Sequence, residues 1–282
     1  RTMWKDRALA AVGVLYLASV SAFAPTPAVA RLRPLTAASS RWTSIELHMQ
    51  QQAPSPDKSW NFGRFAETFT FFNGNPLLKL VPFVSSGAPT VPRPSPVSTS
   101  SSETVVWDFS SINKDEFSAL WAPLDDVVMG GVSASQITQA EHGASLSGVT
   151  TSQNNGGFCS ARTRNVDPAY DLSGFTGVAL RVKCERGMRY KIILRDREGW
   201  DTVAWCHSFD TVAGKWADLK VPFAAFIPVV RGNRITADNP IDASSVFSVQ
   251  VMLSKYEYSG ELNPNFTEGP FQLDFGPIRA YK

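Results

Sequence analysis

From residue 104 to residue 282 the chain consists of short runs of alternating apolar and polar residues, separated by Gly, Asn, Asp and Pro. This pattern is typical of an antiparallel β-sandwich or barrel, because successive side chains of a strand point to opposite faces of the sheet. No segment in this part makes a convincing long helix. The sequence therefore predicts an all-β domain.

Two runs near the ends of this domain have matching patterns. Val105-Val-Trp-Asp-Phe109 is expected to place its odd-numbered residues on one face, and Phe271-Gln-Leu-Asp-Phe275 repeats the arrangement with Gln272 and Asp274 outward. First and last strands of similar pattern indicate that the two ends of the domain lie close together, as they do in jelly rolls.

Two runs in the middle of the domain carry cations at alternate positions. Residues 178–182 and 190–194 supply the apolar positions, and Gly187 lies in a connection that suits a hairpin. If the two runs pair, one outer face carries four cations: Arg181, Lys183, Lys191 and Arg195. Such a face is either an ordinary solvated surface or a patch for an acidic partner or an anionic ligand.

The segment Trp121-Ala-Pro-Leu-Asp-Asp-Val-Val-Met-Gly-Gly-Val-Ser133 joins a pair of carboxylates to a Gly-Gly turn. Asp125 and Asp126 can bond nearby backbone N–H groups, and Gly130 and Gly131 can supply the positive φ values of a tight turn. The segment is either a well-made loop leading into a strand or a ligand or partner site.

Nothing in the sequence defines an enzyme. None of the three histidines, His48, His142 and His207, belongs to a motif that would define a triad. Asp125 and Asp126 are adjacent, so on a strand they would face opposite ways, which is poor geometry for a two-carboxylate glycosidase. We expect a non-catalytic protein.

Metal, cofactor and nucleic-acid sites are not expected either. The three cysteines, Cys159, Cys184 and Cys206, are widely spaced, form no C-x-x-C motif and lack paired histidines that would complete a metal site. No G-x-G-x-x-G follows a strand, which argues against a nicotinamide cofactor. A formal net charge of +2 without a Lys/Arg run gives no support for nucleic-acid binding.

Residues 1–22 are expected to be a signal peptide, because Arg7 precedes an apolar run that ends in the small residues Ser19-Val-Ser-Ala22. Residues 23–55 resemble a transit peptide, since the stretch through Ser44 carries Arg, Ser and Thr but no acid. Ser21-Ala-Phe-Ala-Pro25 resembles the bipartite plastid presequence of algae with red-lineage complex plastids. The expected location is therefore the plastid. The alternative is ordinary secretion, which would make Asn265-Phe-Thr267 a usable glycosylation sequon.

Residues 56–84 form a Phe-rich segment. Phe62, Phe65, Phe69 and Phe72 are three, four and three residues apart, which predicts an apolar stripe on a short helix that ends before Asn73-Gly-Asn-Pro76. The stripe either packs back on the domain or docks to a membrane surface or a membrane-protein partner. Residues 85–103 are rich in Pro and Ser and are expected to form an extended linker.

Several motifs of the domain resemble those of one family, the complex I intermediate-associated protein 30 domains. The matching segments are Leu124–Ser133, Asn155–Arg162, Asp171–Gly174, Phe209–Thr211, Trp216–Phe226 with Arg231-Gly232, and Gly269–Asp274. They occur in order over about residues 104–282. One departure is Cys184-Glu-Arg-Gly187, where the family often has a Gly-Asp-Gly turn, and this puts the geometry of that hairpin in doubt.

The resemblance implies a galactose-binding-like β-sandwich of jelly-roll type, similar to carbohydrate-binding modules, that works as a non-catalytic assembly factor. Name-giving members of the family help to build respiratory complex I, and plastid relatives support photosystem II biogenesis. Together with the leader, this predicts an assembly or scaffold factor for a thylakoid electron-transport complex. Its partners would be subunits or assembly intermediates of that complex, with peripheral membrane contact.

Three alternatives remain open at this stage. The protein could be a permanent peripheral subunit of a photosystem complex, for which the Phe-rich segment would be a fixed anchor. It could be a carbohydrate-binding module, in which Trp200 and an aromatic neighbour would stack on a pyranose ring. If the plastid address is wrong, the expected client is respiratory complex I.

Candidate contact residues come from the matched motifs: Asp126, Met129, Gly130, Gly131, Ser133, Arg162 and Arg231. The four cations at positions 181, 183, 191 and 195 form a secondary surface. A buried Arg162 or Arg231 that bonds loop carbonyls would instead have a structural role.

Overall fold

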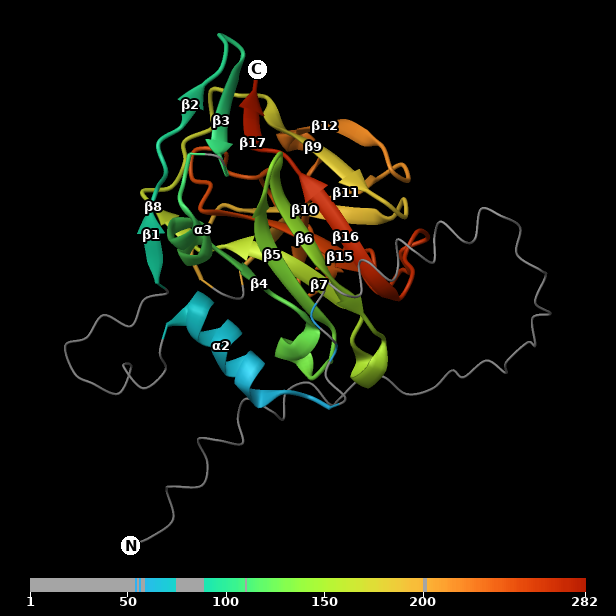
Figure 1. Cartoon of the computed structure of the whole chain (residues 1–282). Helices are drawn as coiled ribbons and strands as arrows, with labels where there is room; N and C mark the ends of the chain where they lie inside the picture. The colour runs from blue at the N-terminus through green and yellow to red at the C-terminus, as the bar shows by residue number, and fades with distance from the viewer. Residues whose placement is uncertain (1–53, 55, 57–58, 75–88, 110, 200–201) are drawn as a thin grey trace, which may run out of the picture. The chain divides into compact units, whose positions relative to one another are not determined.

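The computed structural model (Figure 1) describes residues 54, 56, 59–74, 89–109, 111–199 and 202–282, and every statement below concerns these residues. They belong to a compact unit that spans Arg41–Lys282. The expected signal peptide and nearly all of the transit-like segment lie outside the described residues. In the part that is described, no helix has the length and apolar character needed to cross a membrane.

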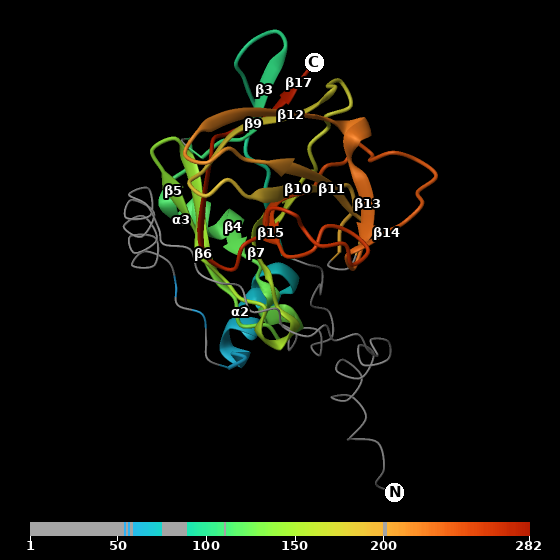
Figure 2. The same ribbon diagram turned by 90° about the vertical axis from the view of Figure 1, so that its right-hand side faces the viewer.

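Two antiparallel sheets make up most of the described chain. Sheet 1 has seven strands in the spatial order β14 (Asn233–Arg234), β13 (Ile227–Val230), β11 (Ala204–Asp210), β10 (Arg189–Arg195), β15 (Ser248–Ser254), β7 (Phe158–Thr163) and β4 (Trp121–Pro123). In Figure 2, β9 and β12 of the other sheet lie as a separate layer above β10 and β11.

Sheet 2 has the order β2 (Val97–Ser98), β3 (Glu103–Trp107), β17 (Ile278–Tyr281), β9 (Gly177–Cys184), β16 (Gly269–Phe275), β6 (Gly143–Thr150) and β5 (Ala134–Ala140). An eighth strand, β12 (Trp216–Pro222), pairs along the other edge of β9. The first long strand of the domain, β3, pairs with the last, β17. The predicted jelly-roll β-sandwich and the closeness of the two domain ends are therefore confirmed.

The core lies between the two sheets and follows the alternation of the strands. In β16, Phe271, Leu273 and Phe275 are buried in the core whereas Gln272 and Asp274 point outward, as predicted. The prediction for Val105 was wrong. Ile278 and Arg279 of β17 are opposite Trp107 and Val105, so Val106 is an extra residue in β3 and the strand buries both Val106 and Trp107 while Val105 turns outward.

The predicted hairpin between the two basic runs was also wrong. β9 pairs with β12, β16 and β17, whereas β10 pairs with β11 and β15, so the chain changes sheets in the connection that contains Gly187. Arg181 and Lys183 consequently lie on sheet 2, and Lys191 and Arg195 on sheet 1. Apolar alternation buries one face of each strand whether the two strands pair in one sheet or lie in the two facing sheets of a sandwich. The pattern therefore cannot distinguish these two arrangements.

Shorter elements surround the sheets. Helix α2 (Phe62–Asn73) begins at the N-cap Asn61, whose side chain accepts a hydrogen bond from the Arg64 amide, and helix α3 (Lys114–Leu120) has a capping box. The short 3₁₀ segments are η2 (Asp126–Met129), η3 (Gln153–Asn155) and η4 (Phe223–Ala225). Within the expected linker, β1 (Thr90–Pro92) pairs in parallel with β8 (Asn165–Asp167), and β2 pairs with β3. This stretch is extended, but it is hydrogen-bonded to the domain.

Candidate partner-contact site

The Asp126 carboxylate links the N-terminal ends of strands β5 and β7. Its side chain is 1% exposed, and its Oδ1 accepts a hydrogen bond from the Ser133 amide at 2.9 Å. Its Oδ2 accepts from the Ser133 hydroxyl at 2.5 Å, the Gly157 amide at 2.7 Å and the Phe158 amide at 3.3 Å. The carboxylate thereby ties the residue before β5 to the residues that open β7, and its hydrogen-bonding capacity is used within the fold.

The two glycines of the turn have different roles. Gly130 has a φ of +92°, as expected for a tight turn. Gly131 does not have a positive φ, which corrects the expectation for this residue. Instead, a Cβ at Gly131 would lie 2.3 Å from Cγ of Asp126, so glycine is required by the close approach of the carboxylate.

Asp125 faces a different set of groups. Its Oδ2 accepts a hydrogen bond from the Ser135 amide at 2.7 Å, and its Oδ1 accepts from the Ser135 hydroxyl at 2.6 Å and the Ser160 amide at 3.2 Å. Arg64 Nη2 lies 3.0 Å from Oδ2 in an ion pair. Burial raises the pKa of Asp125 to about 6, although the Ser135 hydroxyl and the Arg64 charge both act to lower it.

Helix α2 packs on the domain through one set of residues. Arg64 Nη1 donates to the Ser133 carbonyl at 3.1 Å, and Trp60 Nε1 donates to the Val127 carbonyl at 2.7 Å. Phe72 is buried, with the Arg162 guanidinium 5.5 Å from its ring centroid. These contacts fix α2 beside η2 and β4 (Figure 1).

The remaining aromatic residues of the segment form a partly exposed cluster. Trp60 lies 5.9 Å from Phe62 and 5.7 Å from Phe65 between ring centroids, and Phe65 lies 6.0 Å from Phe69. Trp60 is 42% exposed and Phe62 is 66% exposed. We call these four residues the aromatic surface. Exposed Met129 ends the η2 turn whose Val127 carbonyl accepts the Trp60 hydrogen bond.

The Phe stripe was predicted either to pack on the domain or to dock to a membrane or partner, and its members differ in this respect. Phe72 packs on the domain, whereas Phe62, Phe65 and Phe69 belong to the aromatic surface, so their docking role stays a prediction. Sequence reasoning missed Arg64 and Trp60, which anchor the helix. The available signal was that Arg64 is the one cation within the Phe-rich residues 62–73.

The candidate arginines do not form one site. Arg162, on β7, is 3% exposed and donates from Nη2 to Asn165 Oδ1 at 3.3 Å, and burial lowers its pKa. Arg231 is exposed, has a φ of +49° and lies between β13 and β14. Those strands are at the opposite end of sheet 1 from β4, which leads into the Asp125 loop. Arg162 is therefore placed for a structural role, and Arg231 lies apart from the loop.

The basic residues of the secondary surface are also separated. Arg181 lies 3.5 Å from Asp218 and Lys183 lies 2.6 Å from Glu185, all on or beside sheet 2. Lys191 is buried on sheet 1, donates to the carbonyls of residues 256 and 257, and has its pKa lowered by burial. Trp200, the candidate sugar-stacking residue, lies outside the described residues.

The sequence of the domain matches a known family. The family model for complex I intermediate-associated protein 30 (CIA30) matches residues 107–275. The chain belongs to the CIA30 family. The resemblance seen in the motifs is confirmed. CIA30 proteins are non-enzymatic assembly factors associated with complex I assembly. Helix α2 lies before the residues that match the family model.

Individual relatives are distant. An uncharacterized protein of Schizosaccharomyces pombe, C9E9.15, is 24% identical over 172 residues, which cover 56% of this chain and 75% of the yeast protein. Among solved structures, a family 11 carbohydrate-binding module of Clostridium thermocellum is 15% identical, with a TM-score of 0.42 over 65% of this chain and 97% of the module. The agarase AgWH50C is 12% identical, with a TM-score of 0.42 over 64% of this chain and 24% of the enzyme. At such identities the likeness concerns the fold alone.

Proposed function

We propose that this chain is a non-catalytic assembly or scaffold factor for a membrane-embedded photosynthetic complex, and that the aromatic surface of α2 contacts a subunit or assembly intermediate of that complex. The observation that carries this proposal is an exposed aromatic cluster on a helix anchored to the domain. Membership of the CIA30 family supports the general role. The photosynthetic client is inferred from the leader.

The anchoring of α2 favours a binding role for its outer face. Aromatic side chains dominate binding energy at protein interfaces, and exposed apolar clusters mark interaction sites on soluble domains. Arg64, Trp60 and Phe72 hold the helix in one orientation. A partner therefore meets preorganised rings and does not have to order a flexible segment, which reduces the entropic cost of binding.

The leader supports a plastid location, at the stroma or the thylakoid surface, because Ser21-Ala-Phe-Ala-Pro25 resembles a complex-plastid presequence. A reporter fused to residues 1–55 is expected in the plastid. Its appearance in the secretory pathway would contradict this location, and its appearance in mitochondria would favour respiratory complex I as the client.

The contact itself is tested by affinity purification of the tagged full chain from thylakoids, with identification of the co-purifying subunits. Phe62→Asp is expected to lose them. Leu262→Asp is the matched control, because Leu262 is also an exposed apolar residue, at 66%, and lies in a loop after β15. Equal recovery with both variants, or the absence of membrane-complex subunits from the wild-type purification, would contradict the proposal.

Purification of the mature complex separates a factor from a permanent subunit. A factor is expected in immature assemblies and to be absent from the purified mature complex. Stoichiometric presence in the mature complex would instead assign the protein as a peripheral subunit.

A further inference from the structure

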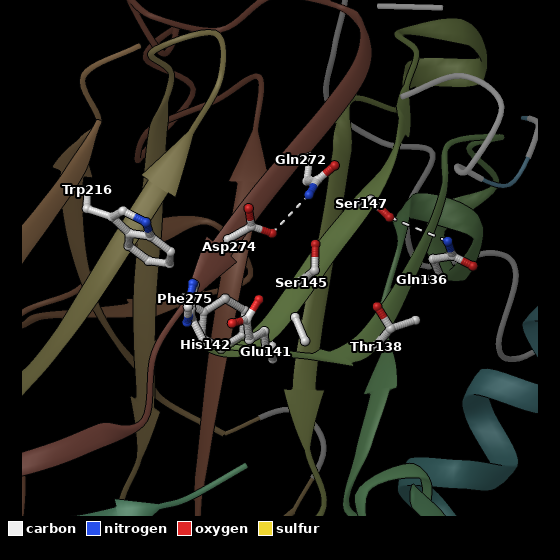
Figure 3. Close-up of a pocket in the computed structure, with 12 residues that line it drawn as sticks. Gln136, Thr138, Glu141, His142, Ser145, Ser147, Trp216, Gln272, Asp274 and Phe275 are labelled. Atoms are coloured by element: carbon white, nitrogen blue, oxygen red, sulfur yellow. Dashed lines mark hydrogen bonds between the residues drawn. The ribbon is translucent and has the colours of Figure 1, made fainter. Parts of the chain in front are cut away.

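The outer face of sheet 2 contains a polar hollow of about 330 Å³ (Figure 3). This volume falls within the range of about 300–1,000 Å³ that is usual for small-molecule sites. Six polar side chains of three neighbouring strands form its floor: Gln136, Thr138, Ser145, Ser147, Gln272 and Asp274. Trp216, from β12, lines one end.

Strand register arranges the floor in two rows. Thr138 of β5 is opposite Ser145 of β6, which is opposite Asp274 of β16. This row continues through Lys183 of β9 to Trp216 of β12. Five adjacent strands span roughly 19 Å at a strand spacing of about 4.8 Å. The second row joins residues 136, 147 and 272 in the same way.

The floor has hydrogen-bonding capacity that the fold does not use. Gln272 Nε2 donates to Asp274 Oδ1 at 2.9 Å, and Gln136 Nε2 donates to Ser147 Oγ at 3.5 Å (Figure 3). The hydroxyls of Thr138 and Ser145 form no side-chain hydrogen bond within the part of the chain that the structure describes. The Thr138 and Ser145 hydroxyls and the Gln272 amide therefore offer lone pairs and protons to a ligand in the hollow.

The charges around the hollow disfavour an anionic ligand. Asp274 lies on the floor and Glu141 lines the hollow, so a phosphate or a nucleic acid would meet carboxylates. Two cations border the hollow and each has a partner: Lys183 pairs with Glu185, and the Arg181 guanidinium lies 5.2 Å from the Trp216 ring centroid. A neutral ligand rich in hydroxyl groups suits this surface better.

The aromatic end of the hollow adds a second kind of contact. Trp216 is half-buried and its ring centroid lies 5.9 Å from that of His142, in an edge-on arrangement. A pyranose ring has an apolar C–H face, which stacks on an indole, and hydroxyls at its edge, which bond amides, hydroxyls and carboxylates. An indole beside a floor of these groups offers both contacts.

We propose that the polar hollow binds a neutral glycosyl chain that runs from Trp216 across β16 and β6 toward Thr138. The chain could belong to a soluble oligosaccharide or to the headgroup of a glycolipid, since both present the same hydroxylated rings. This site is independent of the aromatic surface, which lies on α2.

The test uses the full chain and two kinds of probe. Calorimetry measures binding of cellohexaose, laminarihexaose and maltohexaose, and flotation measures recruitment to phosphatidylcholine vesicles with and without digalactosyldiacylglycerol. Saturable binding of an oligosaccharide identifies a soluble glycan as the ligand. Recruitment that depends on the galactolipid identifies a headgroup. Binding of neither kind of probe overturns the proposal.

Variants assign any binding to the hollow. Trp216→Ala and Gln272→Ala are each expected to weaken binding at least tenfold, whereas Tyr256→Ala, which removes an exposed aromatic side chain in the loop after β15, is expected to leave it unchanged. Gln272→Ala removes only a partly exposed amide, so it decides the outcome if Trp216→Ala fails to fold. Binding that Gln272→Ala leaves undiminished, or that Tyr256→Ala lowers equally, would place the site elsewhere and overturn the proposal.

Discussion

Arg64→Ala removes the ion pair that joins helix α2 to the Asp125 loop. The substitution deletes the 3.0 Å contact with Asp125 Oδ2 and the 3.1 Å hydrogen bond to the Ser133 carbonyl. The Asp125 carboxylate, which is 2% exposed in the wild type, loses its cationic partner. We therefore expect a loss of stability that depends on whether Asp125 is ionised.

The size of the loss follows from the burial of the pair. Removing one partner of a fully buried ion pair costs about 3–5 kcal/mol. The Arg64 side chain is 26% exposed, so water can partly replace it after α2 moves. We expect Arg64→Ala to lower the free energy of unfolding at pH 8 by about 2–4 kcal/mol, allowing for that solvation.

The pH dependence gives a sharper test than the magnitude. The pKa of Asp125 is about 6 in the folded protein, against 3.8 for an ordinary Asp. Because the folded state binds this proton more tightly than the unfolded state does, the contribution of Asp125 to stability is full below pH 3.8. This contribution, about 3 kcal/mol in total, is lost as the pH rises through 6. Without Arg64 the folded pKa rises further, so the loss extends above pH 6. The wild type and Arg64→Ala should therefore differ least at pH 5 and most at pH 8.

Urea unfolding followed by Trp fluorescence at pH 5, 6, 7 and 8 measures this difference. Arg189→Ala is the control, because Arg189 also pairs with a carboxylate, Asp210, at 2.6 Å, but that carboxylate is 48% exposed. The pKa of Asp210 is lowered, so this carboxylate stays ionised from pH 5 to 8. Arg189→Ala should therefore lower the free energy of unfolding by less than about 1 kcal/mol at every pH. A loss in Arg64→Ala that is the same at pH 5 and pH 8, or no larger than the control's, would refute this account of the Asp125 loop.

Two further substitutions test the loop and the helix. Gly131→Ala should cost about 2–4 kcal/mol in urea unfolding because the new Cβ displaces the hydrogen-bonded Asp126 carboxylate, whereas Gly174→Ala, with nothing within 4 Å of its Cβ, should change stability by less than about 0.5 kcal/mol. Phe72→Ala should cost about 3 kcal/mol because this ring is buried, and exposed Phe62→Ala should cost less than about 0.5 kcal/mol. Equal effects within either pair would contradict the packing described here.

Local patterns were sufficient to predict much of the fold. The alternation in Phe271–Phe275 determines which residues enter the core, because a strand offers only two faces. The Phe spacing before Asn73-Gly74 predicts a short helix, and α2 spans Phe62–Asn73. These features depend on residues close in sequence.

Features that depend on distant residues could not be predicted. Strand β9 pairs with β12 in sheet 2, whereas β10 belongs to sheet 1. The apolar alternation of β9 and β10 would be the same if they paired with each other, so it could not predict the sheet of either strand. The outward position of Val105 depends on how β3 pairs with β17, which lies almost the whole domain away in sequence. The partner of Arg64 depends on the docking of a helix that lies outside the residues matched to the CIA30 family.

The two adjacent carboxylates of the loop have different structural roles. Asp126 accepts hydrogen bonds from Ser133 in the loop and from Gly157 and Phe158 at the start of β7, so it stabilises the domain itself. Asp125 satisfies Ser135 and Ser160 within the domain and also pairs with Arg64 of α2. Because the buried Asp125 carboxylate supplies one of the contacts between the domain and the helix that carries the aromatic surface, partner binding and the ionisation of Asp125 should be coupled. Substitution of Arg64 should therefore weaken recovery of client subunits even though Arg64 lies outside the aromatic surface.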